Sequence, residues 1–226
     1  MSTIYHIAPK RSGHAMVARL IQEWCPDTWL VDQENVRPSR FGVSGGTVVL
    51  QTRDLLNWVA SYYQNHVNRV GVCESGTVLK RVKTLWMPIS KEYYRVTTHI
   101  KDRVVRVYYD EFILNEAVRG LVCQQLGGKY SERSINVVKS NGRGSSFDGT
   151  EFDGEAYLME TRRRYRQVPS ELYDHIFTRR PDWLEFYVRH QSPDADKMNF
   201  LRQTLDKKLI KWQMQKQVRV SASMQR

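Results

Sequence analysis

Two short apolar runs in this chain each end at a basic turn and continue directly into a helical pattern. The first covers residues 4–8 and precedes an apolar stripe with helical spacing over residues 16–24. The second covers residues 47–51 and precedes a similar stripe over residues 55–63. A strand that runs through a tight turn into a helix is typical of α/β proteins, which bind ligands at the carboxyl ends of their strands. The pattern therefore predicts two ligand-facing turns on one sheet.

The same alternation continues along the chain. Short runs rich in valine, isoleucine or aromatic residues predict strands over residues 29–31 and 104–108. A third helix is predicted over residues 116–126, and Gly127 is expected to end it as a C-cap. The fold class is therefore α/β, with a mostly parallel central sheet flanked by helices.

The remaining organisation follows from length and composition. We expect one domain over residues 1–226, since this length suits one well-buried core. Residues 139–154 contain four glycines and little periodicity, which predicts a long loop. Beyond them the chain turns helical and basic. Residues from about 205 to 226 are expected to form a basic C-terminal helix and a frayed tail.

Charge and cysteine usage narrow the class of protein. The net charge of +11 and the pI of about 9.7 favour anionic partners such as nucleotides, acidic polysaccharides, nucleic acid or a membrane surface. The three cysteines, Cys25, Cys73 and Cys123, lack metal-ligand spacing, so no metal site is expected. No run approaches the ~18 apolar residues of a membrane span, and no signal peptide is recognised. We therefore expect a cytoplasmic protein.

The first turn combines Lys10, Arg11, Ser12 and Gly13. It lacks the spacing GxxxxGK[ST], so an ordinary nucleoside triphosphatase loop is not supported. A helix N-terminus presents unpaired N–H groups and a positive dipole end to an anion, and glycine lets backbone approach a ligand closely. The alternative is a simple helix cap with two solvated basic residues.

The second turn places Arg53 at the carboxyl end of a predicted strand, and Ser61 follows eight residues later on the predicted helix. Ser61 lies on the side of the helix that carries Asn57 rather than on its apolar stripe. We expect Arg53 and Ser61 to converge on one phosphate if the sheet brings the first turn close. The alternative for Arg53 is a salt bridge at the helix start, with Asp54 or another acid.

Together the two turns resemble those of the sulfotransferase family. Its members pair a Lys/Arg-Ser-Gly turn, here at 11–13, with an Arg-Asp segment, here at 53–54, and a later serine, here Ser61. The similarity is greater to small bacterial-type members written around Arg-Ser-Gly-x-His-Ala; this chain reads Arg-Ser-Gly-His-Ala over residues 11–15, without the intervening residue. The resemblance spans residues 4 to about 190 and implies a P-loop-like sulfotransferase architecture.

The resemblance implies 3′-phosphoadenosine 5′-phosphosulfate (PAPS) as donor and adenosine 3′,5′-bisphosphate (PAP) as product, without a metal. It assigns the 5′-phosphosulfate to the first turn and the 3′-phosphate to the second. The nucleotide-binding residues that it implies in the two turns are Lys10, Arg11, Ser12, Gly13, His14, Ala15, Arg53 and Ser61. The common family turn reads Lys-Ser-Gly-Thr-Thr, so here backbone N–H groups and His14 must replace two threonine hydroxyls.

Later basic segments are also implicated. The sequence around 144–149 resembles a late loop of the family, which implies that Arg143, Ser145 and Ser146 help to hold the 3′-phosphate. The alternative is an ordinary surface loop. The basic run over residues 162–164 is typical of a solvated helix face, and its alternative role is to steer an acidic acceptor.

Sulfuryl transfer in line from phosphate to an acceptor oxygen or nitrogen depends mainly on positioning and charge stabilisation. Arg11 and Lys10 are the candidates that stabilise the leaving phosphate. A general base must take the acceptor proton, and the candidates are His14, Asp32, Glu34 and His66, of which His14 is assigned to the phosphosulfate rather than to the proton. The sequence does not choose among the other three.

The expected function is therefore sulfuryl transfer from PAPS to a hydroxyl or amine of an acceptor, a carbohydrate or another small molecule, that the sequence does not identify. A kinase-like phosphotransferase is disfavoured because the Walker spacing and an aspartate pair for magnesium are missing. A nucleic-acid-binding protein is disfavoured because the aromatic residues fall mostly in apolar stripes rather than on a basic face. An inactive nucleotide-binding protein is the remaining alternative.

Overall fold

The structure is a computed structural model of the chain, and it describes residues 2–42, 45–138, 145 and 147–205. The chain divides into two compact units, Met1–Tyr165 and Arg166–Arg226. The expected basic C-terminal helix and tail lie, beyond residue 205, outside the described residues. In the described part, no helix is long and apolar enough to cross a membrane.

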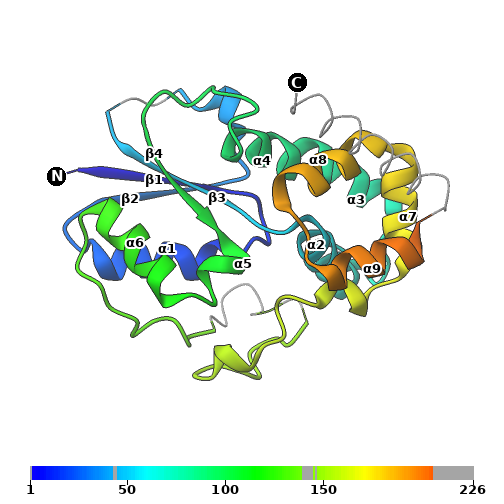
Figure 1. Cartoon of the computed structure of the whole chain (residues 1–226). Helices are drawn as coiled ribbons and strands as arrows, with labels where there is room; N and C mark the ends of the chain where they lie inside the picture. The colour runs from blue at the N-terminus through cyan, green and yellow to red at the C-terminus, as the bar shows by residue number, and fades with distance from the viewer. Residues whose placement is uncertain (1, 43–44, 139–144, 146, 206–226) are drawn as a thin grey trace. The chain divides into compact units, whose positions relative to one another are not determined.

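The first unit is built on a four-stranded sheet whose neighbouring strands are all parallel, in the order β2-β1-β3-β4 (Figure 1). The strands are β1 (Thr3–Ala8), β2 (Trp29–Glu34), β3 (Thr47–Thr52) and β4 (Arg103–Tyr108). All four predicted strands are confirmed, with ends that differ by one to three residues. The α/β fold with a parallel sheet is therefore confirmed.

Helices pack on both faces of this sheet. On one face, α1 (His14–Trp24) and α6 (Glu116–Leu126) enclose a core that includes Ile4, Val49 and Val105. On the other, Ile89 of α4 (Met87–Tyr93) packs with the opposite-facing strand residues, among them Val48. Alternate residues of β3 thus enter different cores, because successive side chains of a strand point to opposite faces. This is why the centre of β3, residues 48–50, is a continuous apolar run.

The other helical segments of the first unit are α2 (Leu55–Val70), α3 (Ser75–Arg81), α5 (Tyr109–Phe112), the short 3₁₀ turns Pro38–Arg40 and Ala156–Leu158, and the π-helical turn Val82–Trp86. A further 3₁₀ turn, Arg164–Gln167, spans the division between the units. The predicted C-cap is confirmed: Gly127 ends α6 in the left-handed conformation, with a φ of 73°.

The second unit is helical as far as it is described. It comprises α7 (Ser170–Arg179), α8 (Pro181–Gln191) and α9 (Ala195–Thr204). Within it α7 packs against α8 and α9, and the rings of Tyr173 and Phe200 meet edge to face with centroids 5.3 Å apart.

The strand order explains how two distant turns meet. The chain leaves β1 through α1 towards β2, on one side of β1, whereas it leaves β3 towards β4, on the other side. The order therefore reverses between the neighbouring strands β1 and β3. Such a reversal opens a crevice at the carboxyl ends of the two strands, where ligands bind in open α/β sheets.

Candidate functional site

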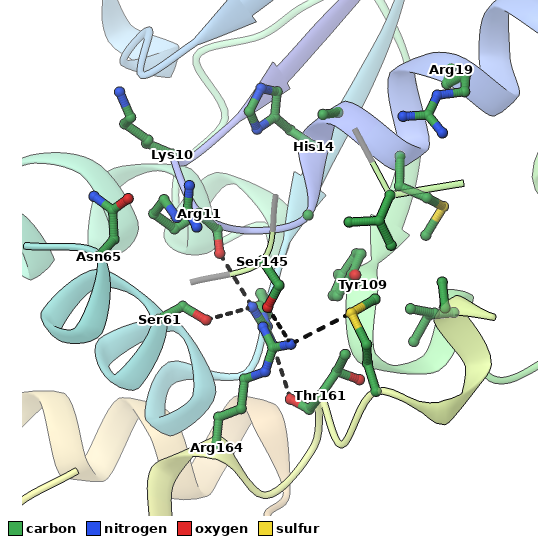
Figure 2. A pocket seen from close by; sticks show the side chains of 18 of the residues that line it. Lys10, Arg11, His14, Arg19, Ser61, Asn65, Tyr109, Ser145, Thr161 and Arg164 are labelled. Carbon is green, nitrogen blue, oxygen red and sulfur yellow. Dashed lines mark hydrogen bonds between the residues drawn. The ribbon is translucent and has the colours of Figure 1, made fainter. Parts of the chain in front are cut away.

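Both predicted turns open onto one cavity of about 610 Å³ (Figure 2). Among the described residues that line it, six carry a cationic side chain: Lys10, Arg11, Arg19, Arg53, Arg69 and Arg164. Glu34 is the single carboxylate among the described lining residues. The cavity is therefore strongly electropositive and suited to a ligand with several negative charges.

The first turn leads into α1 at the cavity. Arg11 and Gly13 both have a positive φ, of 69° and 79°, and Gly13 is the N-cap of α1. Helix geometry leaves the N–H groups of His14 and Ala15, in the first turn of α1, without an acceptor inside the helix. Arg11, His14 and Ala15 all line the cavity, so the start of α1 and a basic residue meet there, as an anion site requires.

Ser12 is the member of this turn that is absent from the described cavity lining. It is completely buried, and the amide nitrogen Nε2 of Gln51 donates to its carbonyl oxygen at 2.6 Å and to its Oγ at 3.3 Å. The oxygen Oε1 of Gln51 lies 2.8 Å from Nε2 of His6. The Ser12 side chain therefore belongs to the buried hydrogen-bond network of Gln51 and His6 and does not line the cavity. The sequence did not predict this.

The second turn is tied to the first through Arg53. Its Nη1 donates to Ser61 Oγ at 3.0 Å and to the carbonyl of Arg11 at 3.3 Å, while Nη2 donates to the carbonyl of Thr161 at 2.9 Å (Figure 2). The predicted proximity of Arg53, Ser61 and the first turn is confirmed. Arg53 is only 2% exposed, yet it still borders the cavity.

The two carboxylates near this turn, those of Asp54 and Asp110, make different interactions. Asp54 accepts a hydrogen bond from the backbone N–H of Asn57 at 2.9 Å and so caps α2. Asp110 Oδ1 lies 3.8 Å from Arg53 Nε, and its Oδ2 accepts from the backbone N–H of Asp54 at 2.8 Å. The ring of Tyr109, 5.1 Å from the Arg53 guanidinium, covers another side of that group.

Arg164 corrects the prediction for the basic run over residues 162–164. Arg162 and Arg163 are exposed, as expected, but Arg164 is 6% exposed and lines the cavity. Its Nη2 donates to Ser145 Oγ at 2.9 Å and to Asp148 Oδ2 at 2.8 Å. Arg162 and Arg163 lie in a bend and Arg164 begins a 3₁₀ turn, so the three arginines do not form one face of an α-helix.

Of the three residues implied in the late loop, the structure describes one. Ser145 lines the cavity beside Arg164, whereas the implied residues Arg143 and Ser146 lie outside the described residues. No pattern in the sequence indicated that Ser145 and Arg164, nineteen residues apart, would form a hydrogen bond.

The cationic side chains of the cavity repel one another. Burial lowers the pKa of Arg11, and the nearby charges of Arg53 and Arg69 lower it further, whereas Glu34 acts in the opposite direction. Burial, followed by the charge of Arg53, lowers the pKa of Arg164 to about 10. Both guanidinium groups remain charged at neutral pH, so a bound anion relieves a repulsion that is present in the free protein.

A group of acidic and imidazole side chains borders the same cavity. His14 Nδ1 lies 3.1 Å from Glu34 Oε1, and His14 Nε2 lies 3.8 Å from Asp32 Oδ2. Burial lowers the pKa of His14, against the opposing effect of Glu34 and Asp32, so the imidazole is neutral at pH 7. Asp32 also lies 3.5 Å from Nδ1 of the buried His6.

The three candidate bases are placed differently. Glu34 lines the cavity, whereas Asp32 and His66 do not belong to the described lining. His66 instead stacks on Tyr62, with ring centroids 6.4 Å apart and an angle of 21° between the planes. The structure therefore brings Glu34 together with the two turns and leaves His66 apart.

The lining residues that the sequence interpretation missed include Arg19, Asn65, Arg69 and Tyr109. Asn65 and Arg69 continue Ser61 at intervals of four residues along α2, so helical periodicity was a signal from which they could be found. Tyr109 and Arg19 offered no comparable signal.

No protein-family model, no curated protein and no solved structure matches this chain. Among the described residues, no group of three or more histidines, cysteines, aspartates or glutamates is placed to hold a metal ion.

Proposed function

We propose that this protein is a sulfotransferase that uses PAPS as donor. The observation that carries the proposal is that two basic turns, at the carboxyl ends of neighbouring strands, open onto one cavity with six cationic side chains and one carboxylate. A nucleotide with phosphate groups at two positions matches two separate anion-binding corners. The motifs of both turns add the resemblance to sulfotransferases.

In this proposal each corner holds one end of the donor. The N–H groups at the start of α1 and the guanidinium of Arg11 bind the 5′-phosphosulfate. Arg53, Ser61 and Arg164 surround the 3′-phosphate, and guanidinium groups suit phosphate because they bind it in a bidentate manner. The apolar part of the lining, which includes Met16 and Ile113, remains for the nucleoside.

PAPS supplies an activated sulfuryl group when it is bound. The guanidinium of Arg11 and the ammonium of Lys10 neutralise charge on the leaving phosphate, an electrostatic role in which Arg11 stays protonated. Glu34, held beside His14, is the carboxylate placed to accept the proton from the acceptor hydroxyl or amine. Asp32 lies beside the other ring nitrogen of His14 and supports the imidazole from there.

The assignment of the proton acceptor predicts that Glu34→Gln lowers kcat by about 100-fold or more, since general bases contribute roughly 10²–10⁴-fold. The amide keeps the volume of the side chain and removes its basicity. Asp32→Asn is the matched control, because Asp32 is absent from the described lining, and its effect on kcat is expected to stay below about tenfold. Steady-state rates with labelled PAPS measure both, and equal losses in the two variants would contradict the assignment of Glu34.

Thermal unfolding in the presence of nucleotides tests the proposed function itself. We expect PAP to raise the melting temperature more than ATP or AMP at equal concentration, because only PAP places phosphate groups at both corners. An equal response to all three nucleotides would favour a kinase-like or a non-specific anion-binding protein. Selective binding of PAP without transfer of label from PAPS to a panel of hydroxyl compounds and amines would identify an inactive nucleotide-binding protein.

A further inference from the structure

One face of α2 leads outward from the cavity floor. Ser61, Asn65 and Arg69 lie four residues apart on this helix and all line the cavity. Their exposure increases along the helix: Ser61 is buried, Asn65 half-buried and Arg69 exposed. The stripe therefore runs from the buried Arg53–Ser61 corner to the mouth of the cavity.

The outer part of this stripe has unused binding capacity. In the described part of the structure, the side chains of Asn65 and Arg69 have no hydrogen-bond or ion-pair partner, and the same is true of Lys10 Nζ. By contrast, Arg53 and Arg164 are hydrogen-bonded to protein groups. Figure 2 shows Lys10 and Asn65 on the same side of the cavity, beside Arg11.

The opposite side of the cavity has a different character. Tyr109 lies there in Figure 2, and the lining beyond the cations is largely apolar, with Met16, Ile113, Val137 and Met159. An aromatic nucleoside base suits the apolar side because its burial there removes apolar surface from water. The side of Asn65 and Arg69 is then left for the acceptor.

On the side of Asn65 and Arg69, the positive charges of the described lining exceed the negative ones. Glu34, the one carboxylate of the described lining, lies 3.1 Å from His14. Lys10, Arg11, Arg53 and Arg164 are assigned to the phosphate groups of the donor. Arg69 therefore remains as a surplus cation, and its charge reaches far enough into the cavity to act on Arg11.

We propose that the acceptor is itself an anion, a hydroxyl compound whose carboxylate is bound by Arg69 and Asn65 on α2. This inference rests on the proposed sulfotransferase function. In the transfer, the bond from sulfur to the donor phosphate oxygen breaks and its electron pair stays on that oxygen. A bond from the acceptor oxygen to sulfur forms, and the acceptor proton passes to Glu34. The carboxylate takes no part in these bond changes and serves to position the hydroxyl.

The test compares acids with their neutral esters as acceptors. The two pairs are 4-hydroxybenzoate with its methyl ester, and glucuronic acid with its methyl ester, each offered to the full-length protein with labelled PAPS. We expect the acid of each pair to have a kcat/KM about tenfold higher or more, as one added charged hydrogen bond provides. In Arg69→Gln the preference is expected to fall to about twofold or less, while the affinity for PAP stays within about twofold of wild type.

Arg81→Gln is the matched control. Arg81 lies exposed on α3, outside the described lining, and its substitution removes the same single charge. Its acid preference should equal that of wild type. The inference is overturned if the esters are transferred as well as the acids, if neither acid is sulfated, or if Arg69→Gln keeps the full preference. Failure of PAP to bind would instead overturn the proposed function, so the two failures are distinguishable.

Discussion

Replacement of Arg53 by lysine is expected to lower the affinity for PAP by about 30-fold or more. The guanidinium of Arg53 donates to Ser61, to the carbonyl of Arg11 and to that of Thr161 from two different nitrogens. An ammonium group keeps the charge but cannot reproduce this planar arrangement of donors. Disturbing a buried, hydrogen-bonded charge costs about 2–5 kcal/mol, which corresponds to at least ~30-fold in affinity. Isothermal titration calorimetry with PAP and AMP measures the change.

The comparison between the two nucleotides makes this experiment specific. Because Arg53 is assigned to the 3′-phosphate, Arg53→Lys should reduce the affinity for PAP much more than that for AMP. Arg106→Lys is a suitable control: Arg106 Nε donates to the carbonyl of Tyr93 at 2.9 Å, and Arg106 does not belong to the described cavity lining. If Arg53→Lys binds PAP as tightly as wild type, the assignment of the second turn is wrong.

Replacement of Gly13 by alanine is expected to destabilise the fold by about 2–4 kcal/mol, through backbone strain and steric overlap together. Gly13 has a φ of 79°, which L-residues with a Cβ rarely adopt. A Cβ at this position would also lie 2.0 Å from Cε2 of the Tyr109 ring. Tyr109 is itself buried against Arg53, so relief of the overlap would displace a part of the cavity wall. Chemical denaturation measures the free energy of unfolding.

Substitutions at two further glycines separate the contributions of backbone strain and steric overlap to the loss of stability. Gly127→Ala introduces a Cβ at a φ of 73° into open space, so it reports strain alone, expected at about 1–2 kcal/mol. Gly120→Ala lies in the interior of α6, where the new Cβ would meet no described atom within 4 Å apart from its chain neighbours and the backbone of its own helix, and it should stabilise the helix by about 0.5–1 kcal/mol. The double variant Gly13→Ala/Tyr109→Ala removes the steric overlap in the Gly13→Ala background. A loss for Gly13→Ala no larger than that for Gly127→Ala would show that Tyr109 does not restrict this turn.

The strands and the two turns were predictable because their causes are local. The centre of β3, residues 48–50, is apolar throughout since both faces of the strand are buried, and its turn into α2 is marked by Arg53 and by the cap Asp54. The end of α6 at Gly127 follows from the left-handed conformation that glycine adopts most readily. These features depend on the residues within a few positions of themselves.

The prediction failed or stayed open where the answer depended on distant segments. Ser12 lies beside Arg11 in the sequence, but Gln51 of the neighbouring strand holds it away from the cavity wall. Glu34 and Asp32 are equally plausible bases by sequence, since they lie two residues apart on one strand. Their different positions relative to the cavity depend on how β2 pairs with β1 and where α1 begins.

The amino-acid sequence by itself determined the α/β class, the alternation of strands and helices, and the two basic turns, because burial patterns and turn chemistry act over short distances. The tertiary structure decided that both turns share one cavity, that Arg164 turns inward while Arg162 and Arg163 stay exposed, and that Asn65 and Arg69 extend the wall. The physical reason is the reversal of strand order between β1 and β3. It brings segments more than forty residues apart together at the carboxyl ends of these two strands.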